Sequence, residues 1–129
     1  GKYEYDYIID AIDSITPKIN LIKAAYALKR KIVMSGGAGG KVDPTQLTVS
    51  DLSKTYNCVF VKTIRKRLKK DKIYKGIKVV FSSELPDKSS LIMTDGTNFK
   101  KSAYGTVSYL PAAFGGVCAS VVIRDLMTE

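Results

Sequence analysis

Two carboxylates, Asp10 and Asp13, stand within and just after an apolar run that opens near the start of the chain. The β-branched isoleucines of residues 7–14 predict a strand buried on both faces, as inside parallel sheets. Ligands of open α/β sheets sit just past the carboxyl ends of the strands. Asp13 is therefore a candidate to hold a metal ion or to orient a phosphate. A helix-capping aspartate without a ligand fits the same spacing, and both interpretations stay open.

A glycine-rich stretch at residues 36–40 is a second candidate for ligand contact. Glycine lets a backbone approach a ligand closely. A Walker loop would need Gly in place of Ser35 and Ser or Thr in place of Val42, and a dinucleotide fingerprint would open a helix, whereas Asp43-Pro44 follows here. Both phosphate motifs fail. The stretch predicts a flexible turn between strands, beside whatever Asp13 binds.

A basic run is the third candidate. Residues 65–78 contain eight Lys or Arg and one acid, Asp71, partly on the outer face of a predicted helix. A solvated surface is the usual meaning of such a run, and contact with a nucleic-acid backbone is the alternative. Arg65 could instead reach back to a nucleotide or to the sheet. The candidate nucleic-acid-binding residues are Arg65, Lys66, Arg67, Lys69 and Lys70.

Composition limits the possible chemistry. The chain has 129 residues, a net charge of +9, two cysteines and no histidine. The lack of histidine makes a structural zinc site very unlikely and excludes Ser-His and Cys-His nucleophile pairs within the chain. Cys58 and Cys118 are expected to be packed thiols. The length suits a single domain, and because the first residue is Gly rather than Met, we expect a piece of a longer protein.

Periodicity predicts an α/β fold in which a strand, a helix and a second parallel strand form a right-handed crossover, so that both strand ends reach the same sheet edge. Lys18 is expected to face outward from the first helix. The predicted helices cover residues 17–30, 59–70 and 111 onward, and the later strands residues 32–34, 46–52, 78–82 and 106–110. Residues 86–102 are expected to form a polar, irregular and mobile crossover loop.

The uncharged segment 103–123 requires a membrane test. It contains Gly105, Pro111 and several Ser and Thr residues, and its apolar part covers only residues 110–123. That length is too short for a bilayer span. We expect a buried core helix and no membrane span.

Several short motifs together resemble one family, the C-terminal half of the ThiF/MoeB/HesA adenylating enzymes, which are related to ubiquitin-activating enzymes. Within it the chain is most similar to the tRNA threonylcarbamoyladenosine dehydratases. The resemblance covers nearly the whole chain, residues 1–129, in the same order throughout. The motifs are DAIDS at 10–14, PK at 17–18, GGAGG at 36–40, DPT at 43–45, KT at 54–55 and VFSSE at 80–84.

The resemblance implies a Rossmann-like, mixed and mostly parallel sheet flanked by helices, in a cytoplasmic homodimer that uses ATP and Mg²⁺ to adenylate a carboxylate. In the dehydratases that carboxylate belongs to the threonylcarbamoyl group on a tRNA adenosine, and loss of AMP closes a ring. By motif position Asp13 matches the catalytic aspartate at the ATP phosphates and the metal. Asp10 is implied as its partner at the strand end, in a structural role or at the ATP, and Gly36 and Gly37 as neighbours of the ATP.

Three departures accompany the resemblance. The family's nucleotide loop, ribose-binding acid and phosphate-binding Arg and Lys belong to a half that is absent here, so this chain alone is expected to be inactive. Cys58-Val59-Phe60 replaces the Asp-Pro-Leu typical of the dehydratases. Residues 86–102 lack the cysteines typical of sulfur-carrier activators. An adenylyltransferase for a ubiquitin-like sulfur carrier and a non-catalytic nucleic-acid-binding module remain the alternatives.

Overall fold

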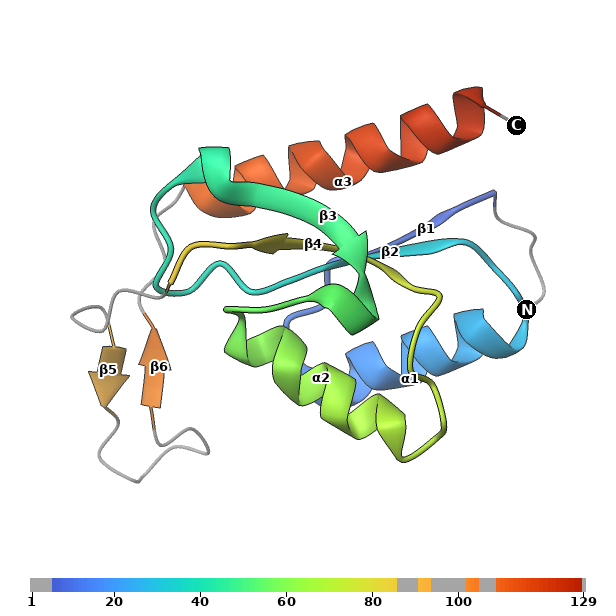
Figure 1. Ribbon diagram of the computed structural model, residues 1–129, viewed down its shortest axis with the longest axis horizontal. Helices are drawn as coiled ribbons and strands as arrows, with labels where there is room; N and C mark the ends of the chain where they lie inside the picture. Colours follow the sequence, from blue (N-terminus) through green and yellow to red (C-terminus); the bar gives the residue numbers. More distant parts are fainter. Residues whose placement is uncertain (1–5, 86–90, 94–101, 105–108, 129) are drawn as a thin grey trace.

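The computed structural model describes residues 6–85, 91–93, 102–104 and 109–128. Strands and helices alternate along its first part, as the hydrophobic pattern predicts (Figure 1). The helices are α1 (Ile15–Ala27), α2 (Val59–Lys69) and α3 (Tyr109–Met127), with short 3₁₀ turns η1 (Pro44–Gln46) and η2 (Leu52–Lys54). The strands are β1 (Ile8–Asp10), β2 (Ile32–Ser35), β3 (Leu47–Asp51), β4 (Lys78–Ser82), β5 (Leu91–Met93) and β6 (Ser102–Tyr104).

The main sheet has the strand order β1-β2-β4-β3. β1 pairs parallel with β2, and β2 pairs parallel with β4, whereas β3 runs antiparallel to β4. The loops after β1, β2 and β4 therefore leave the same edge of the sheet, which we call the carboxyl edge. The predicted α/β class and the predicted strand 78–82 are confirmed, and β5 and β6 form a separate antiparallel pair.

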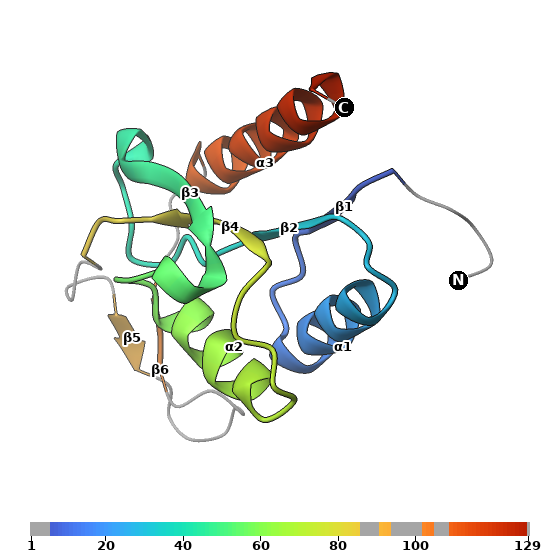
Figure 2. The same ribbon diagram turned by 45° about the vertical axis from the view of Figure 1, so that its right-hand side comes forward.

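Helices cover both faces of the main sheet (Figures 1 and 2). α1 and α2 lie on one face, over a core that includes Ile22, Ile64 and Phe81. α3 lies on the other face, where Leu110, Phe114, Cys118 and Val121 pack on β2 and β4. The central strands β2 and β4 are buried on both faces, which explains their nearly continuous apolar sequences.

The last helix differs from its prediction. It begins at Tyr109, two residues before Pro111, so Leu110 is helical and not part of a strand. Only one side of α3 packs on the sheet, and Ile123, Leu126 and Met127 are exposed. α3 is the one helix of the described chain long and apolar enough to cross a membrane, which is weak evidence because helices that pack on a sheet pass the same test. The helix is thus longer than the apolar part 110–123 from which its length was judged, and the described residues contain no strong membrane span.

Two further expectations concern the segment before α3. The predicted strand 106–110 falls on residues 106–108, which lie outside the described part, and on α3; the nearest described strand is β6. The predicted loop 86–102 also lies largely outside the described residues, but Leu91–Met93 within it forms β5. That segment is therefore not wholly irregular.

Candidate active site

A small cavity opens at the carboxyl edge, where the loop after β1 meets the loop after β2. Its volume is about 240 Å³. Asp13, which is exposed, lines this cavity together with Gly36 and Gly37 from the loop after β2 and with Phe60 from α2. The fold thus brings together two segments that the sequence singled out separately. The remaining lining residues are Ala11, Ile12, Ser35, Ala38 and Gly39.

The loop that carries Asp13 is held by a buried lysine. The Nζ atom of Lys18 lies 3.1 Å from the Asp10 carboxylate, and both side chains are fully buried. Lys18 also donates a hydrogen bond to the carbonyl oxygen of Ile12 at 2.9 Å, and the Ile12 N–H donates to Asp10 at 3.1 Å. Both the N–H and the carbonyl group of Ile12, the residue immediately before Asp13, are therefore hydrogen-bonded.

Lys18 was predicted to face solvent, and that prediction was wrong. Periodicity placed it outside because lysine is rarely buried without a partner. Asp10 supplies that partner from the end of β1. Asp10 itself does not line the cavity, so the structure does not bring it together with Asp13 as a second open carboxylate.

Burial dominates the electrostatics of this pair. Desolvation raises the pKa of the Asp10 carboxyl, against the charge of Lys18 and the Ile12 hydrogen bond. Desolvation likewise lowers the pKa of Lys18, against the charge and hydrogen bond of Asp10. Each charge is costly to bury and is compensated mainly by the other. Loss of either partner would leave an uncompensated charge beneath the Asp13 loop.

Gly36 and Gly37, which also line the cavity, have a packing role. The Gly36 N–H donates to the carbonyl oxygen of Val80 at 2.7 Å. A Cβ atom at Gly36 would lie 3.0 Å from that oxygen and 3.1 Å from Val61, and one at Gly37 would lie 3.1 Å from the Cβ of Phe60. Glycine therefore allows the close approach of this loop to β4 and α2, where a Cβ atom would force its neighbours to shift.

A second buried lysine, which the sequence did not reveal, fixes the neighbouring loops. Lys41 is 2% exposed and donates to the carbonyl oxygens of Asn57 and Glu84. The Glu84 carboxylate in turn accepts hydrogen bonds from the N–H groups of Val42 and Asp43. These contacts join the loops that follow β2 and β4 to the loop before α2. In the sequence, the one feature that could have pointed to the burial of Lys41 was its position at the end of a glycine-rich stretch.

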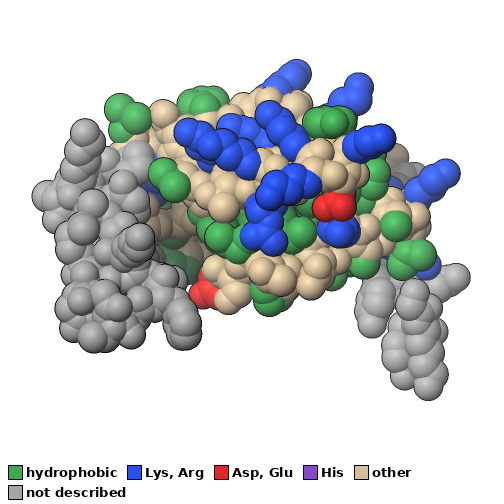
Figure 3. All heavy atoms as spheres, turned by 90° about the horizontal axis from the view of Figure 1, so that it is seen from below, with side chains coloured by type: hydrophobic (Ala, Val, Ile, Leu, Met, Phe, Trp, Pro, Cys, Tyr) green, Lys and Arg blue, Asp and Glu red, His purple; other side chains and the backbone are tan. Residues whose placement is uncertain are grey.

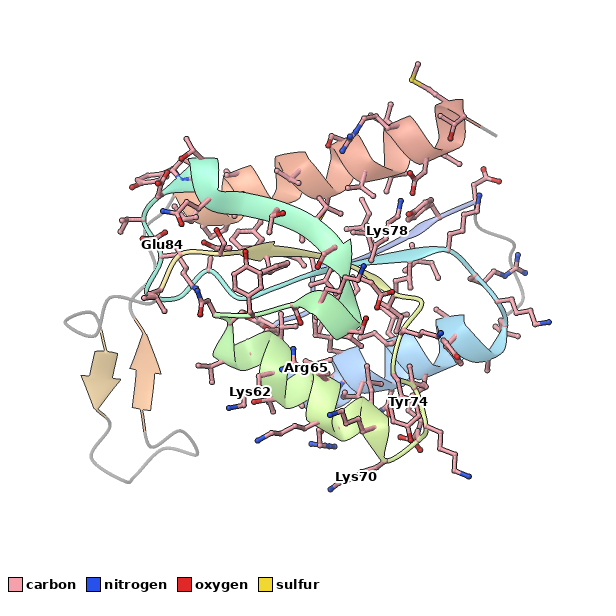
Figure 4. All side chains as sticks on the ribbon, viewed as in Figure 1. Lys62, Arg65, Lys70, Tyr74, Lys78 and Glu84 are labelled. Atoms are coloured by element: carbon pink, nitrogen blue, oxygen red, sulfur yellow. The ribbon has the colours of Figure 1, made fainter. Side chains whose placement is uncertain are left out.

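The basic face of α2 consists of the exposed residues Lys62, Lys66, Arg67, Lys69 and Lys70. Seen from below, the molecule shows many Lys and Arg side chains and few acidic ones (Figure 3). Lys62 and Lys70 extend away from the sheet (Figure 4), and α2 has no acidic residue in its first turn. Arg65 differs, because its guanidinium donates to Thr55 at 3.0 and 2.7 Å. It binds the loop between η2 and α2, whereas the sequence left a nucleotide or the sheet as its two alternatives.

The two cysteines and the possible metal ligands add little to the candidate site. Cys58 and Cys118 are buried free thiols, as expected, and burial raises the pKa of Cys118. Among the described residues there is no group of three or more Asp, Glu, Cys or His side chains that could hold a metal ion. Within the same part of the chain, Asp13 is the one carboxylate that lines the cavity.

A larger cavity, about 660 Å³, lies at the opposite edge of the sheet, beside the start of β2 and β4. A hydrogen-bonded cluster lines it: Tyr7 donates to Asp125 at 2.7 Å, and Lys78 pairs with the same carboxylate at 2.7 Å. We place the candidate site at the smaller cavity, because α/β sheets bind their ligands at the carboxyl ends of the strands.

Comparison with known proteins identifies the family of this chain. A model of the ThiF family matches residues 2–129. This chain belongs to the ThiF family. Among curated relatives of this ThiF-family chain, the tRNA threonylcarbamoyladenosine dehydratase of Bacillus subtilis (strain 168) is 33% identical over 134 residues, which cover 98% of the chain and 53% of the relative. The dehydratase of Escherichia coli (strain K12) is 37% identical over 144 residues, with 97% and 53% covered.

Solved structures show the same likeness. The E. coli tRNA N6-threonylcarbamoyladenosine dehydratase in complex with ATP superposes with a TM-score of 0.81 at 35% identity, covering 98% of this chain and 50% of that one. The same enzyme in complex with AMP gives a TM-score of 0.80 at 36% identity, with 96% and 49% covered. The expected family and the mostly parallel sheet flanked by helices are thereby confirmed. The chain spans about half the length of the relatives it matches.

Proposed function

We propose that this chain is part of an ATP-dependent enzyme that adenylates the threonylcarbamoyl group of a tRNA adenosine and then cyclises it with loss of AMP. The observation that carries the proposal is that the exposed Asp13 lines one cavity with Gly36 and Gly37, at the carboxyl edge of a ThiF-family sheet. Relatives of this chain are named as dehydratases of that tRNA modification, and one was solved with ATP.

Asp13 is the residue that would stand beside the phosphates of ATP. Mg²⁺ is usually held by one or two carboxylates together with substrate phosphates, and it keeps several waters. A single open carboxylate in a cavity with room beside it fits that pattern. When bound, the ion would neutralise charge around the attacked phosphorus. In this chain, Lys18 would hold the loop that carries Asp13 in position. Gly36 and Gly37 would keep their part of the cavity free of side chains.

The half of the parent protein that this chain does not contain would supply the glycine-rich nucleotide loop and the basic phosphate ligands. We propose that the parent acts as a homodimer and that the chain alone is inactive. The RNA backbone would lie on the basic face of α2, with Lys66, Arg67, Lys69 and Lys70 as contacts. Phosphate contacts of this kind give affinity that falls steeply with salt.

A substrate test separates this function from its nearest alternative. The full-length parent is incubated with ATP, Mg²⁺ and either threonylcarbamoyl-modified tRNA or a ubiquitin-like sulfur-carrier protein, and release of pyrophosphate and AMP is measured. We expect the modified tRNA to drive both releases and to gain the cyclic product. Release driven by the carrier protein alone would replace the dehydratase function with carrier activation, and no release with either would contradict adenylation.

A further inference from the structure

A second cavity of about 240 Å³ lies beside the first turn of α2. It is lined by Tyr56, Asn57, Cys58, Val59 and Lys62. The next residue of the same turn, Phe60, lines the Asp13 cavity. The two cavities are therefore neighbours along α2, and nothing in the proposed adenylation chemistry uses the second one.

Tyr56 gives this cavity an exposed but fixed aromatic wall. The residue is 55% exposed, yet its ring packs edge-on against the buried ring of Phe81, with centroids 5.2 Å apart and planes at 78°. Val59 beside it is 59% exposed. An exposed aromatic ring that is already held in place loses little conformational entropy when a flat partner stacks on it.

The loop that presents Tyr56 is held from both sides. The buried Lys41 ammonium binds the carbonyl oxygen of Asn57 at 2.5 Å, and the Asn57 side chain donates to the carbonyl oxygen of Ser83 at 2.8 Å. On the other side, Arg65 donates to the carbonyl and hydroxyl oxygens of Thr55. The cavity is thus preformed, because its loop is tied to the loops that follow β2 and β4 and to α2.

The lysines in and beside this cavity indicate that its ligand is an anion. Among the described residues, Lys62 is the one charged residue that lines the cavity, and Lys66 and Lys70 follow it at intervals of four residues, which places the three on one side of α2. An anionic chain can follow this stripe with one of its units in the cavity. Unpaired RNA bases stack on aromatic side chains, while their phosphates bind lysines.

We propose that this cavity binds one unpaired nucleotide of the RNA substrate, with its base against Tyr56 and Val59 and its phosphate on Lys62. The inference rests on the proposed function for the presence of an RNA substrate. It adds that the enzyme recognises a single-stranded part of that RNA, next to the site of adenylation, by stacking as well as by charge.

The test measures binding of the full-length parent to two RNAs of equal length, a hairpin with 2-aminopurine in its unpaired loop and a blunt duplex. We expect Tyr56→Ala to weaken hairpin binding by about 5- to 100-fold, to leave duplex binding unchanged and to abolish the change of 2-aminopurine fluorescence on binding. Tyr56→Phe should behave as the wild type. Lys62→Ala should reduce the salt dependence of hairpin binding by about one phosphate contact, whereas Tyr56→Ala should not.

Two controls keep the result interpretable. Tyr74→Ala removes a comparably exposed tyrosine, 54% exposed, from beyond the other end of α2, and should leave hairpin binding unchanged. Tyr56→Leu keeps an apolar contact with Phe81 but cannot stack, so it should lose hairpin affinity while its melting temperature stays close to that of the wild type.

The nucleotide pocket is refuted if Tyr56→Leu binds the hairpin as well as the wild type does, if hairpin and duplex lose affinity equally, or if Tyr56 variants impair binding of a carrier protein instead. Failure of the dehydratase function looks different. In that case modified tRNA would not drive pyrophosphate release, while the Tyr56-dependent preference for unpaired RNA would remain.

Discussion

The Asp13 cavity and the basic face of α2 carry their charges in opposite ways. Beneath the cavity, Lys18 and Asp10 are fully buried and paired at 3.1 Å. On α2, Lys62, Lys66 and Lys70 extend into solvent. Buried pairs hold backbone in one position and are costly to disrupt, whereas exposed lysines add little to stability but attract anions over a distance. We propose that the first region serves chemistry at a fixed point and that the second recognises a long, flexible anion.

The largest expected effect comes from disrupting the buried pair. Lys18→Met should lower the free energy of unfolding by about 3–5 kcal/mol, because it leaves the Asp10 carboxylate buried without a counter-ion. Urea unfolding of the full-length protein measures this loss. The double variant Asp10→Asn/Lys18→Met should recover much of it. A single variant as stable as the wild type would show that the pair does not hold the Asp13 loop.

The basic face should respond in the opposite manner. Changing Lys66, Lys69 and Lys70 together to Glu should lower the unfolding free energy by about 1–2 kcal/mol at most, because the positions are exposed and only the dipole at the end of α2 disfavours the new carboxylates. RNA affinity should fall, and the slope of log affinity against log salt should decrease by about 2–3, because three phosphate contacts are lost. An unaltered salt slope would remove α2 from the RNA interface.

The smallest effect concerns Asp125, a partly exposed carboxylate that is hydrogen-bonded. Its hydrogen bonds from Lys78 and Tyr7 lower its pKa. A carboxyl whose pKa is lower in the folded state stabilises the fold above its unfolded pKa, about 3.9, and loses that contribution as pH falls through the folded value. Asp125→Asn should therefore lower the melting temperature slightly at pH 7, and the difference from the wild type should vanish in strong acid. A difference that persists at low pH would contradict an electrostatic origin.

Much of this organisation follows from the sequence. Parallel strands with continuous apolar residues predicted the sheet, and the strand-helix-strand order predicted that the loops after β1 and β2 share one edge. From these local rules alone, Asp13 is expected beside Gly36 and Gly37, and the cavity that all three line confirms it. These rules are sufficient to place the loops, because the spacing of apolar residues and the direction of the strands decide which sheet edge a loop occupies.

The buried lysines could not be found in that way. Helical spacing treats every lysine as an outward residue, and only the three-dimensional proximity of Asp10 makes burial of Lys18 tolerable. Lys41 is stabilised by backbone carbonyls of two distant loops, a contact that leaves no pattern in the sequence. The start of α3 was missed for a related reason: proline is accepted throughout the first turn of a helix, so Pro111 did not mark the first helical residue.

We propose that Asp13 stands beside the phosphates of ATP. ATP–pyrophosphate exchange by the full-length parent tests it most directly, with Asp71→Asn as a control aspartate that is exposed beyond the far end of α2 and paired with Lys23. We expect Asp13→Ala and Asp13→Asn to lower the exchange rate by at least about 100-fold, with unchanged melting temperature, and Asp71→Asn to retain the full rate. Exchange at the wild-type rate in Asp13→Ala would contradict the account.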